Sequence, residues 1–169
     1  MKDRLIQEFK ENAVYRLNES SRMIDIAMKK IGEEAIWKRP NAVSNSIGNL
    51  MLHLCGNIRQ YAISSLGNTP DIRSRDTEFE AQEGYSKMEL LEMLNQTVLE
   101  AIETIKAVSD EELVRVRDVQ GFQLSGIGII MHVVEHYSYH TGQIAFWVKQ
   151  LENMELGFYD GFDLNIKNE

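Results

Sequence analysis

Three of the four histidines in the chain follow one another at intervals of four residues, as His132, His136 and His140. Residues four apart on an α-helix lie roughly 40° from each other around its axis, so the three imidazoles share one face. Ile129 and Trp147 fall near the same line, which indicates that this face points into the protein rather than into solvent. Buried imidazole nitrogens are costly without polar partners, and a bound metal ion is one partner that satisfies them.

The residues by themselves leave two interpretations of these histidines open. A pair at i and i+4 has the spacing that helical metal chelation requires, but here it lacks the adjacent catalytic glutamate of an H-E-x-x-H motif. Glu135 lies about 100° around a helix from His136 and points off the histidine face. A lone histidine on an apolar face, such as His53, is more often a hydrogen-bonded core residue than a ligand. Spacing also leaves open whether His132 or His140 is the supporting member of the set.

The surrounding chain predicts four long amphipathic helices. Apolar residues recur every three or four positions in 2–31, 44–66, 86–107 and 127–151, which is the periodicity of a helix with one buried face. We therefore expect an all-α protein, a four-helix bundle that forms one domain over residues 1–169. Serines placed to cap these helices are Ser44 or Ser46, Ser86 (in a capping box with Glu89) and Ser125.

The segments between the helices are less regular. Residues 67–84 contain Gly, Pro and many charged residues, and they show no periodic apolar signal. They are long enough for a crossover between the second and third helices along the length of a bundle, or for a functional loop. Residues 114–124 alternate apolar and polar side chains, which is compatible with a short β-hairpin or with an extended loop.

Composition and charge exclude several classes of function. The net charge of −8 disfavours binding to nucleic acid and to anionic membrane surfaces. No apolar stretch reaches the roughly 18 residues of a membrane span, and the charged first residues do not form a signal peptide. The single Cys55 excludes an internal disulfide and a zinc finger. We expect a cytoplasmic protein.

Three stretches resemble a known family. They are N-L-M-L-H-L-C-G-N-I-R-Q-Y at 49–61, R-S-R-D-T-E-F at 73–79 and H-V-V-E-H-Y-S-Y-H-T-G-Q-I at 132–144. Together they are similar to the DinB/YfiT-like superfamily of metalloenzymes, and within it to the DUF1572 group. The resemblance extends over nearly the whole chain and implies a four-helix bundle with a metal site.

The resemblance also implies which residues form that site. The family motifs match His53, His136 and His140, which would then bind a divalent metal ion. His132 becomes a supporting or core residue, and Gln143 belongs to the Gly-Gln pair that follows the motif. Superfamily members include transferases that activate a low-molecular-weight thiol such as bacillithiol, so the resemblance suggests a thiol S-transferase that acts on small electrophiles. A metal-dependent hydrolase and a non-catalytic metal-binding or interaction bundle are the alternatives.

The chemistry of such a site follows from its ligands. Three neutral imidazoles leave the full charge on the ion, and a three-ligand site keeps positions open for water or substrate. Cys55 does not close the site as a fourth ligand, because it lies two residues and about 200° around the helix from His53. Imidazole suits several metals, so Zn, Ni and Fe all remain candidates. The sequence assigns no catalytic residue.

The remaining candidates surround the histidines. Arg73 and Arg75 lie in the crossover, where they could form ion pairs that pin the loop or reach an anionic substrate or the thiol cosubstrate. Asn57, one turn after His53, is a further pocket candidate together with His132 and Gln143. As partners we expect a small-molecule substrate and a second copy of the chain in a homodimer.

Overall fold

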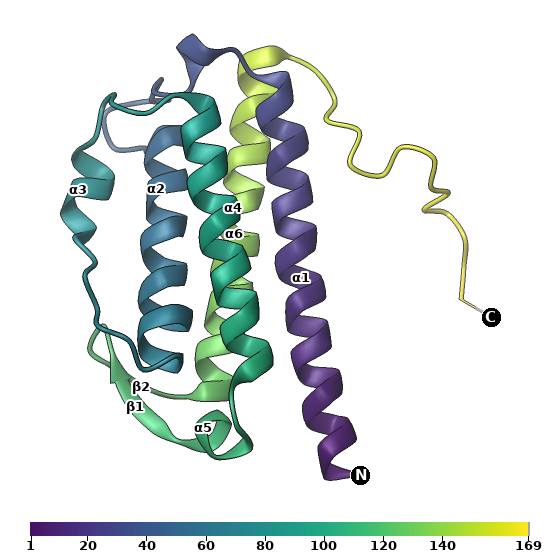
Figure 1. Ribbon diagram of the computed structural model, residues 1–169. Helices are drawn as coiled ribbons and strands as arrows, with labels where there is room; N and C mark the ends of the chain where they lie inside the picture. The colour runs from purple at the N-terminus through teal and green to yellow at the C-terminus, as the bar shows by residue number, and fades with distance from the viewer. Residues whose placement is uncertain (169) are drawn as a thin grey trace.

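Four long helices run side by side along the molecule in a computed structural model, which describes residues 1–168 (Figure 1). Figure 1 places α1 and α4 beside each other, α6 behind them and α2 on the far side, while the C-terminal tail runs away from the bundle. The elements in chain order are the α-helix α1 (Lys2–Lys30), the 3-10 turn η1 (Glu33–Ala35), α2 (Ile47–Ile58), the π-helical η2 (Arg59–Leu66), α3 (Arg75–Glu80), α4 (Lys87–Ala107), α5 (Asp110–Val114), the strands β1 (Val116–Val119) and β2 (Phe122–Ser125), and α6 (Gly126–Glu152).

The four long helices enclose one apolar core. Each packs on two others: α1 contacts α4 and α6, and α2 contacts the same two helices from the opposite side. Leu17, Met51, Leu94 and Val133 are at most 1% exposed and represent the four helices in this core. The predicted all-α bundle is therefore confirmed. None of the described helices is both long and apolar enough to cross a lipid bilayer.

Serine caps define where the helices begin. Ser46, and not Ser44, caps α2, because its hydroxyl accepts a hydrogen bond from the Asn49 amide while the Asn49 side chain accepts from the Ser46 backbone. The same reciprocal box joins Ser86 and Glu89 at the start of α4. These side chains satisfy amides that the first helical turn leaves without partners.

The second helix is less regular than its apolar pattern predicted. After Ile58 it continues as π-helix, and the amide of Gly67 closes it on the carbonyl of Ala62, five residues back. A π-turn holds one more residue than an α-turn and changes which side chains face the neighbouring helix. The predicted continuous helix to Leu66 is correct in extent but not in winding.

The crossover contains a short helix that the sequence did not predict. α3 lies outside the bundle against α2 (Figure 1). The side-chain nitrogen Nδ2 of Asn49 donates to the backbone carbonyls of Glu78 at 3.0 Å and Ala81 at 2.7 Å, at the end of this helix. Six residues are too few for a periodic apolar signal or for independent helical stability, so these tertiary contacts decide the conformation. The predicted crossover thus contains one helical segment, α3, that its sequence pattern did not reveal.

The alternating segment before α6 forms the hairpin, one of its two predicted alternatives. β1 and β2 pair antiparallel, with Val119 opposite Phe122. The two linking residues, Gln120 and Gly121, both have positive φ, at 52° and 84°. A two-residue turn with two positive φ values matches the twist of the paired strands.

Candidate metal centre

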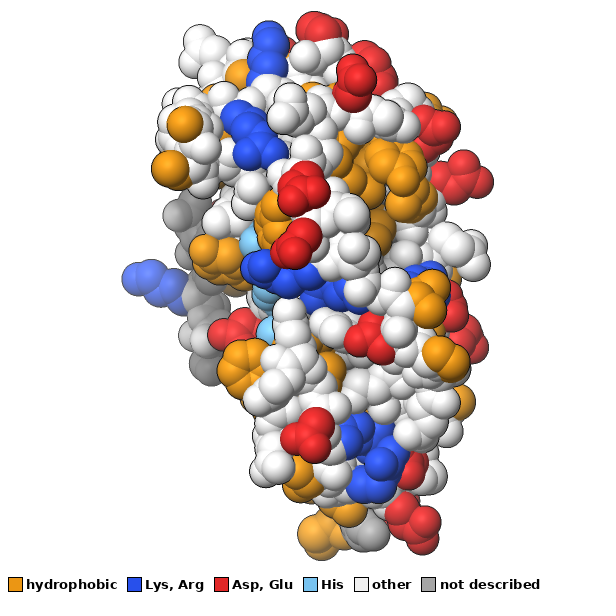
Figure 2. Space-filling model, turned by 90° about the vertical axis from the view of Figure 1, so that its left-hand side faces the viewer, with side chains coloured by type: hydrophobic (Ala, Val, Ile, Leu, Met, Phe, Trp, Pro, Cys, Tyr) orange, Lys and Arg blue, Asp and Glu red, His pale blue; other side chains and the backbone are white. Residues whose placement is uncertain are grey.

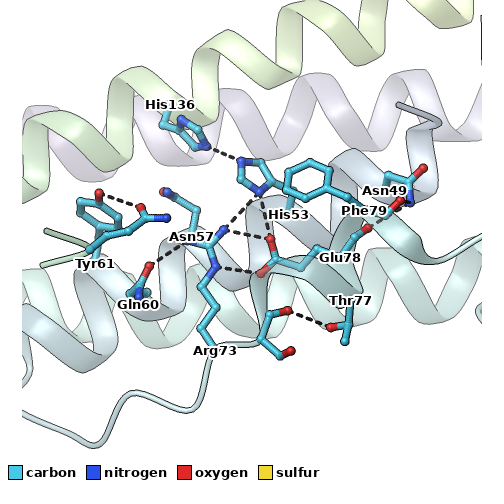
Figure 3. Close-up of polar contacts among 12 residues, drawn as sticks. Asn49, His53, Asn57, Gln60, Tyr61, Arg73, Thr77, Glu78, Phe79 and His136 are labelled. Carbon is cyan, nitrogen blue, oxygen red and sulfur yellow. Dashed lines mark hydrogen bonds and ion pairs between the residues drawn. The ribbon is translucent and has the colours of Figure 1, made fainter. Parts of the chain in front are cut away.

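Three histidines from two helices meet inside the bundle. His53 comes from α2, and His136 and His140 come from successive turns of α6. One ligand nitrogen from each lies within 4.8 Å of the others, and the Nε2 atoms of His53 and His136 are 2.9 Å apart (Figure 3). Two nitrogens bound to one ion by bonds of about 2.1 Å lie at most about 4.2 Å apart, so this pair fits a shared metal.

The surroundings favour the neutral form of the two histidines on α6. Burial, and after it the charges that His140 and His53 would carry, together lower the pKa of His136 to about 3. Burial also lowers the pKa of His140, although a contact with Gln143 opposes the effect. A neutral imidazole has a free lone pair, which is the form that binds metal.

A carboxylate from the crossover orients His53. Nδ1 of His53 donates a hydrogen bond to Oε2 of Glu78 at 2.9 Å, which leaves the lone pair of Nε2 facing His136 (Figure 3). Glu78 also accepts two hydrogen bonds from Arg73, at 2.7 and 2.9 Å. Burial alone would raise the pKa of Glu78, but the bonds from Arg73 and His53 outweigh it and lower the pKa. A carboxylate behind a histidine ligand fixes its tautomer and raises its basicity.

Arg73 is committed to this arrangement. Its side chain is 3% exposed, and besides Glu78 it donates to Oε1 of Gln60 at 2.8 Å. Arg73 thus pins the crossover and supports Glu78, so its guanidinium is not free to hold a substrate. Arg75 is exposed and lies over the ring of Phe79, 4.8 Å from its centre, and Phe79 in turn packs against His53.

Gly56 makes room for the carboxylate. It lies on α2 one turn after His53, and a Cβ atom added there would collide with Oε1 of Glu78 and approach the Nε of Arg73. A side chain at this position is therefore incompatible with the observed place of Glu78. The position needs glycine because of close approach, not because of its backbone angles.

His132 stands beside the cluster without joining it. Its ring stacks between Tyr61, at 4.0 Å, and His136, at 5.2 Å between ring centres. Its Nε2 lies 3.3 Å from the amide nitrogen of Asn57. The Oδ1 of Asn57 is buried and has no hydrogen-bond partner among the described residues. A buried amide oxygen without a partner beside a possible metal site is what a bound water or ligand would satisfy.

Two further contacts complete the picture. The amide oxygen of Gln143 lies 2.7 Å from Nδ1 of His140, so it supports this histidine as Glu78 supports His53. Cys55 is separate from the described histidine cluster, and burial raises its pKa to about 12. It therefore stays a thiol at neutral pH and is neither a ligand nor a nucleophile here.

The cluster is reachable from outside. Figure 2 shows histidine atoms at the surface of the face that carries α3, between hydrophobic and basic side chains. His53 and His140 are 6% and 8% exposed, while His136 is only partly buried. Solvent and small molecules can therefore approach the histidines from this face.

Comparison with known proteins places the chain. The family model described as protein of unknown function DUF1572 matches residues 5–158. The chain belongs to the DUF1572 family. None of the curated proteins matches it. Two solved structures share the fold of this DUF1572 protein.

Both structures are DinB-like proteins from Bacillus. A protein of Bacillus subtilis, YjoA, is 18% identical, covers 90% of this chain and 96% of its own, and has a TM-score of 0.65. A protein of Bacillus cereus ATCC 10987 is 14% identical, with 89% and 94% coverage and a TM-score of 0.68. At such low identity, these likenesses show that this DUF1572 protein shares the fold of DinB-like proteins and nothing further.

The sequence missed Glu78 and Gly56 as parts of the site. Glu78 appeared only as one of several charges in the crossover, and Gly56 showed no motif of its own. The available signal was an acidic residue directly followed by an aromatic one, Phe79, in an otherwise polar stretch. A large aromatic side chain favours burial, and a carboxylate that is buried beside it needs a partner.

Proposed function

We propose that this DUF1572 protein is a divalent-metal-dependent enzyme that transfers a low-molecular-weight thiol to a small electrophile. The observation that carries the proposal is the partly accessible cluster of His53, His136 and His140, in which burial lowers the pKa of His136 and His140. A divalent ion held by these residues would act as a Lewis acid and would favour the thiolate form of a thiol. Zn, Ni and Fe(II) all suit three imidazoles.

The protein side of this chemistry is preorganised. Glu78 and Gln143 hold the outer nitrogens of His53 and His140, so both rings present their other nitrogen to the site. The negative charge of Glu78 is balanced by Arg73 in a buried ion pair. The candidate ligands are therefore all histidines, and none of them would cancel the charge of a bound ion. Retained positive charge at the centre favours an anionic thiolate over a neutral ligand.

A metal-dependent hydrolase is the second candidate. The buried Oδ1 of Asn57 favours it, because an unpaired acceptor beside the cluster can orient a water molecule. The same acceptor could bind the S–H of an incoming thiol, so the two candidates share a site and differ in nucleophile. A bundle that binds metal without catalysis is the remaining alternative.

Metal content is the first test. Protein purified without a histidine tag, and after reconstitution with Zn, Ni or Fe(II), should contain close to one ion per chain by elemental analysis. His136→Ala should lose this ion, and His132→Ala should keep it. Absence of near-stoichiometric metal in the wild type would refute both the transferase and the hydrolase.

Turnover is the second test. The loaded protein is mixed with bacillithiol and monochlorobimane, and conjugate formation is followed by fluorescence. We expect a rate that depends on protein and metal, and that disappears in His136→Ala. Metal binding with no transfer for bacillithiol, mycothiol or glutathione, but with hydrolysis of ester substrates, would select the second candidate.

A further inference from the structure

A pocket of about 520 Å³ lies one helical turn from the histidine cluster. Leu50 precedes His53 by three residues on α2, and Gln143 follows His140 by three residues on α6, and both line the pocket. The two helices run in opposite directions, so both steps lead toward the same end of the bundle (Figure 1). Gln143 joins the two sites directly, because its side chain lines the pocket and contacts Nδ1 of His140.

The pocket walls are held in place before any ligand arrives. The side chain of Asn41 accepts hydrogen bonds from the amides of Val43 and Ser44, at 3.0 and 2.9 Å, and fixes the loop before α2. The indole nitrogen of Trp147 donates to the carbonyl of Lys38 at 3.3 Å and ties the same loop to α6. The volume lies within the range of pre-formed small-molecule sites, about 300–1,000 Å³.

The lining residues define the chemistry of an occupant. Leu50, Phe146 and Trp147 supply apolar and aromatic surface, and Phe146 is 64% exposed at the rim. No lining residue is charged, although the chain as a whole carries a net charge of −8. A charged ligand would lose hydration here without gaining a counter-charge, whereas an aromatic ring would be stacked and shielded from water.

Amide side chains supply the polar contacts. The side-chain amides of Asn45 and Gln150 make no hydrogen bond to a described residue, and Gln143 uses only its oxygen. Each free amide group offers hydrogen bonds that match a neutral carbonyl, amide or hydroxyl. A ligand with an aromatic part and one such neutral polar group satisfies both kinds of surface at once.

We propose that this pocket binds an uncharged aromatic molecule with an amide-like polar group, and that such a molecule is the electrophile presented to the histidine centre. The second half of this statement rests on the proposed function. The first half does not, because the lining residues lie outside the three-histidine set. Binding can therefore be measured on the full chain with or without metal.

The test uses two probes of nearly equal shape, 4-fluorobenzamide and 4-fluorobenzoate, whose affinities are measured by fluorine NMR titration. We expect the amide to bind at least tenfold more tightly than the benzoate, both to metal-free and to zinc-loaded protein. Phe146→Ala should weaken amide binding at least fivefold. Phe122→Ala is the matched control, since Phe122 is an aromatic residue of similar exposure (61%) on the distant hairpin, and it should change nothing.

A second pair of variants tests the preference for a neutral ligand by introducing a positive charge. Gln150→Lys introduces a cation into the pocket wall and should reduce the preference for the amide at least tenfold, while Gln82→Lys on the exposed crossover should not. Equal affinity for the two probes, no binding of either, or equal effects of the two phenylalanine variants would each overturn the pocket proposal. If the wild type binds no metal, the probe affinities would still test the pocket, and only the proposed function would be overturned.

Discussion

Glu78 Oε2 lies 2.9 Å from Nδ1 of His53, and this contact joins the crossover to the bundle at the histidine cluster. Both side chains are 8% exposed. Because Arg73 fixes the carboxylate from its other side, a surface segment controls the orientation of a residue at the centre of the molecule. The first two predictions concern this relationship.

Glu78→Gln should weaken metal binding without preventing it. The amide can no longer draw the Nδ1 proton of His53 as strongly, and losses of about 10- to 100-fold in affinity are typical of such changes. Arg73 also loses its charged partner in a buried place, so unfolding should cost about 3 kcal/mol less. Competition with a chromophoric zinc chelator measures the affinity, and urea denaturation the stability. Glu80→Gln, an exposed change on the same helix, should alter neither.

Gly56→Ala should reproduce the metal defect of Glu78→Gln through a steric route. The added methyl would occupy the place of Oε1 of Glu78 and displace the carboxylate from His53. The double variant should then bind zinc no more weakly than the weaker single variant, because both changes remove one interaction. Fully additive losses would show that Gly56 acts elsewhere. Gly142→Ala on α6 is the control: its Cβ meets nothing within 4 Å, so it should stabilise the helix by about 0.5–1 kcal/mol.

His132 and His140 should respond differently to zinc. A ligand that binds only the folded state stabilises it by about 2.7 kcal/mol at a concentration of 100 times Kd. Zinc should therefore raise the Tm of the wild type and of His132→Ala, but leave His140→Ala nearly unchanged. Differential scanning fluorimetry with and without zinc measures the shift. A zinc response lost in His132→Ala and kept in His140→Ala would reverse the assignment of the two residues.

Acid should destabilise the metal-free protein already at mildly acidic pH. His136 has a pKa of about 3 in the folded state because of burial and then the neighbouring imidazoles, against an ordinary value of 6.5. Between these values the unfolded chain binds more protons, so the free energy of unfolding falls as the pH is lowered. One group contributes at most about 1.4 kcal/mol per pH unit, and less here because the ring is partly solvated.

Urea denaturation between pH 7.5 and 5 tests this dependence. The carboxyl of Glu78 does not interfere, because its lowered pKa makes its own contribution disappear only at more acidic pH. In His136→Gln the slope of stability against pH should become shallower. An unchanged slope in this variant would show that other groups cause the acid sensitivity.

The sequence predicted the bundle because its signals are local. Apolar periodicity lies within each helix, and serine caps such as Ser46 and Ser86 act within its first turn, and the structure has those helices. The three clustered histidines could also be predicted from the sequence, but His53 was assigned to the same site as the pair on α6 only through the resemblance to a family. Its spacing alone did not distinguish it from a core histidine.

The features that the sequence did not predict depend on distant contacts. α3 is stabilised by the side-chain amide of Asn49, almost thirty residues earlier. No sequence pattern within α3 itself predicts a helix there. The roles of Glu78 and Gly56 follow from the docking of α3 and were missed for the same reason. The pocket beside Gln143 likewise needs a loop, α2 and α6 to be placed together.

The π-helix η2, which continues α2, separates the register of His53 from that of Tyr61. A π-turn is an α-helix with one residue inserted, so the residues before it keep their positions while those after it are shifted. His53 and Asn57 precede Arg59, where the π-helix begins, and Tyr61, which stacks on His132, lies within it. Deleting one residue from this segment would turn Tyr61 away from His132, yet leave His53 in register on α2. A change of one residue in the length of this segment would therefore alter the packing beside the metal centre without moving its ligand on α2.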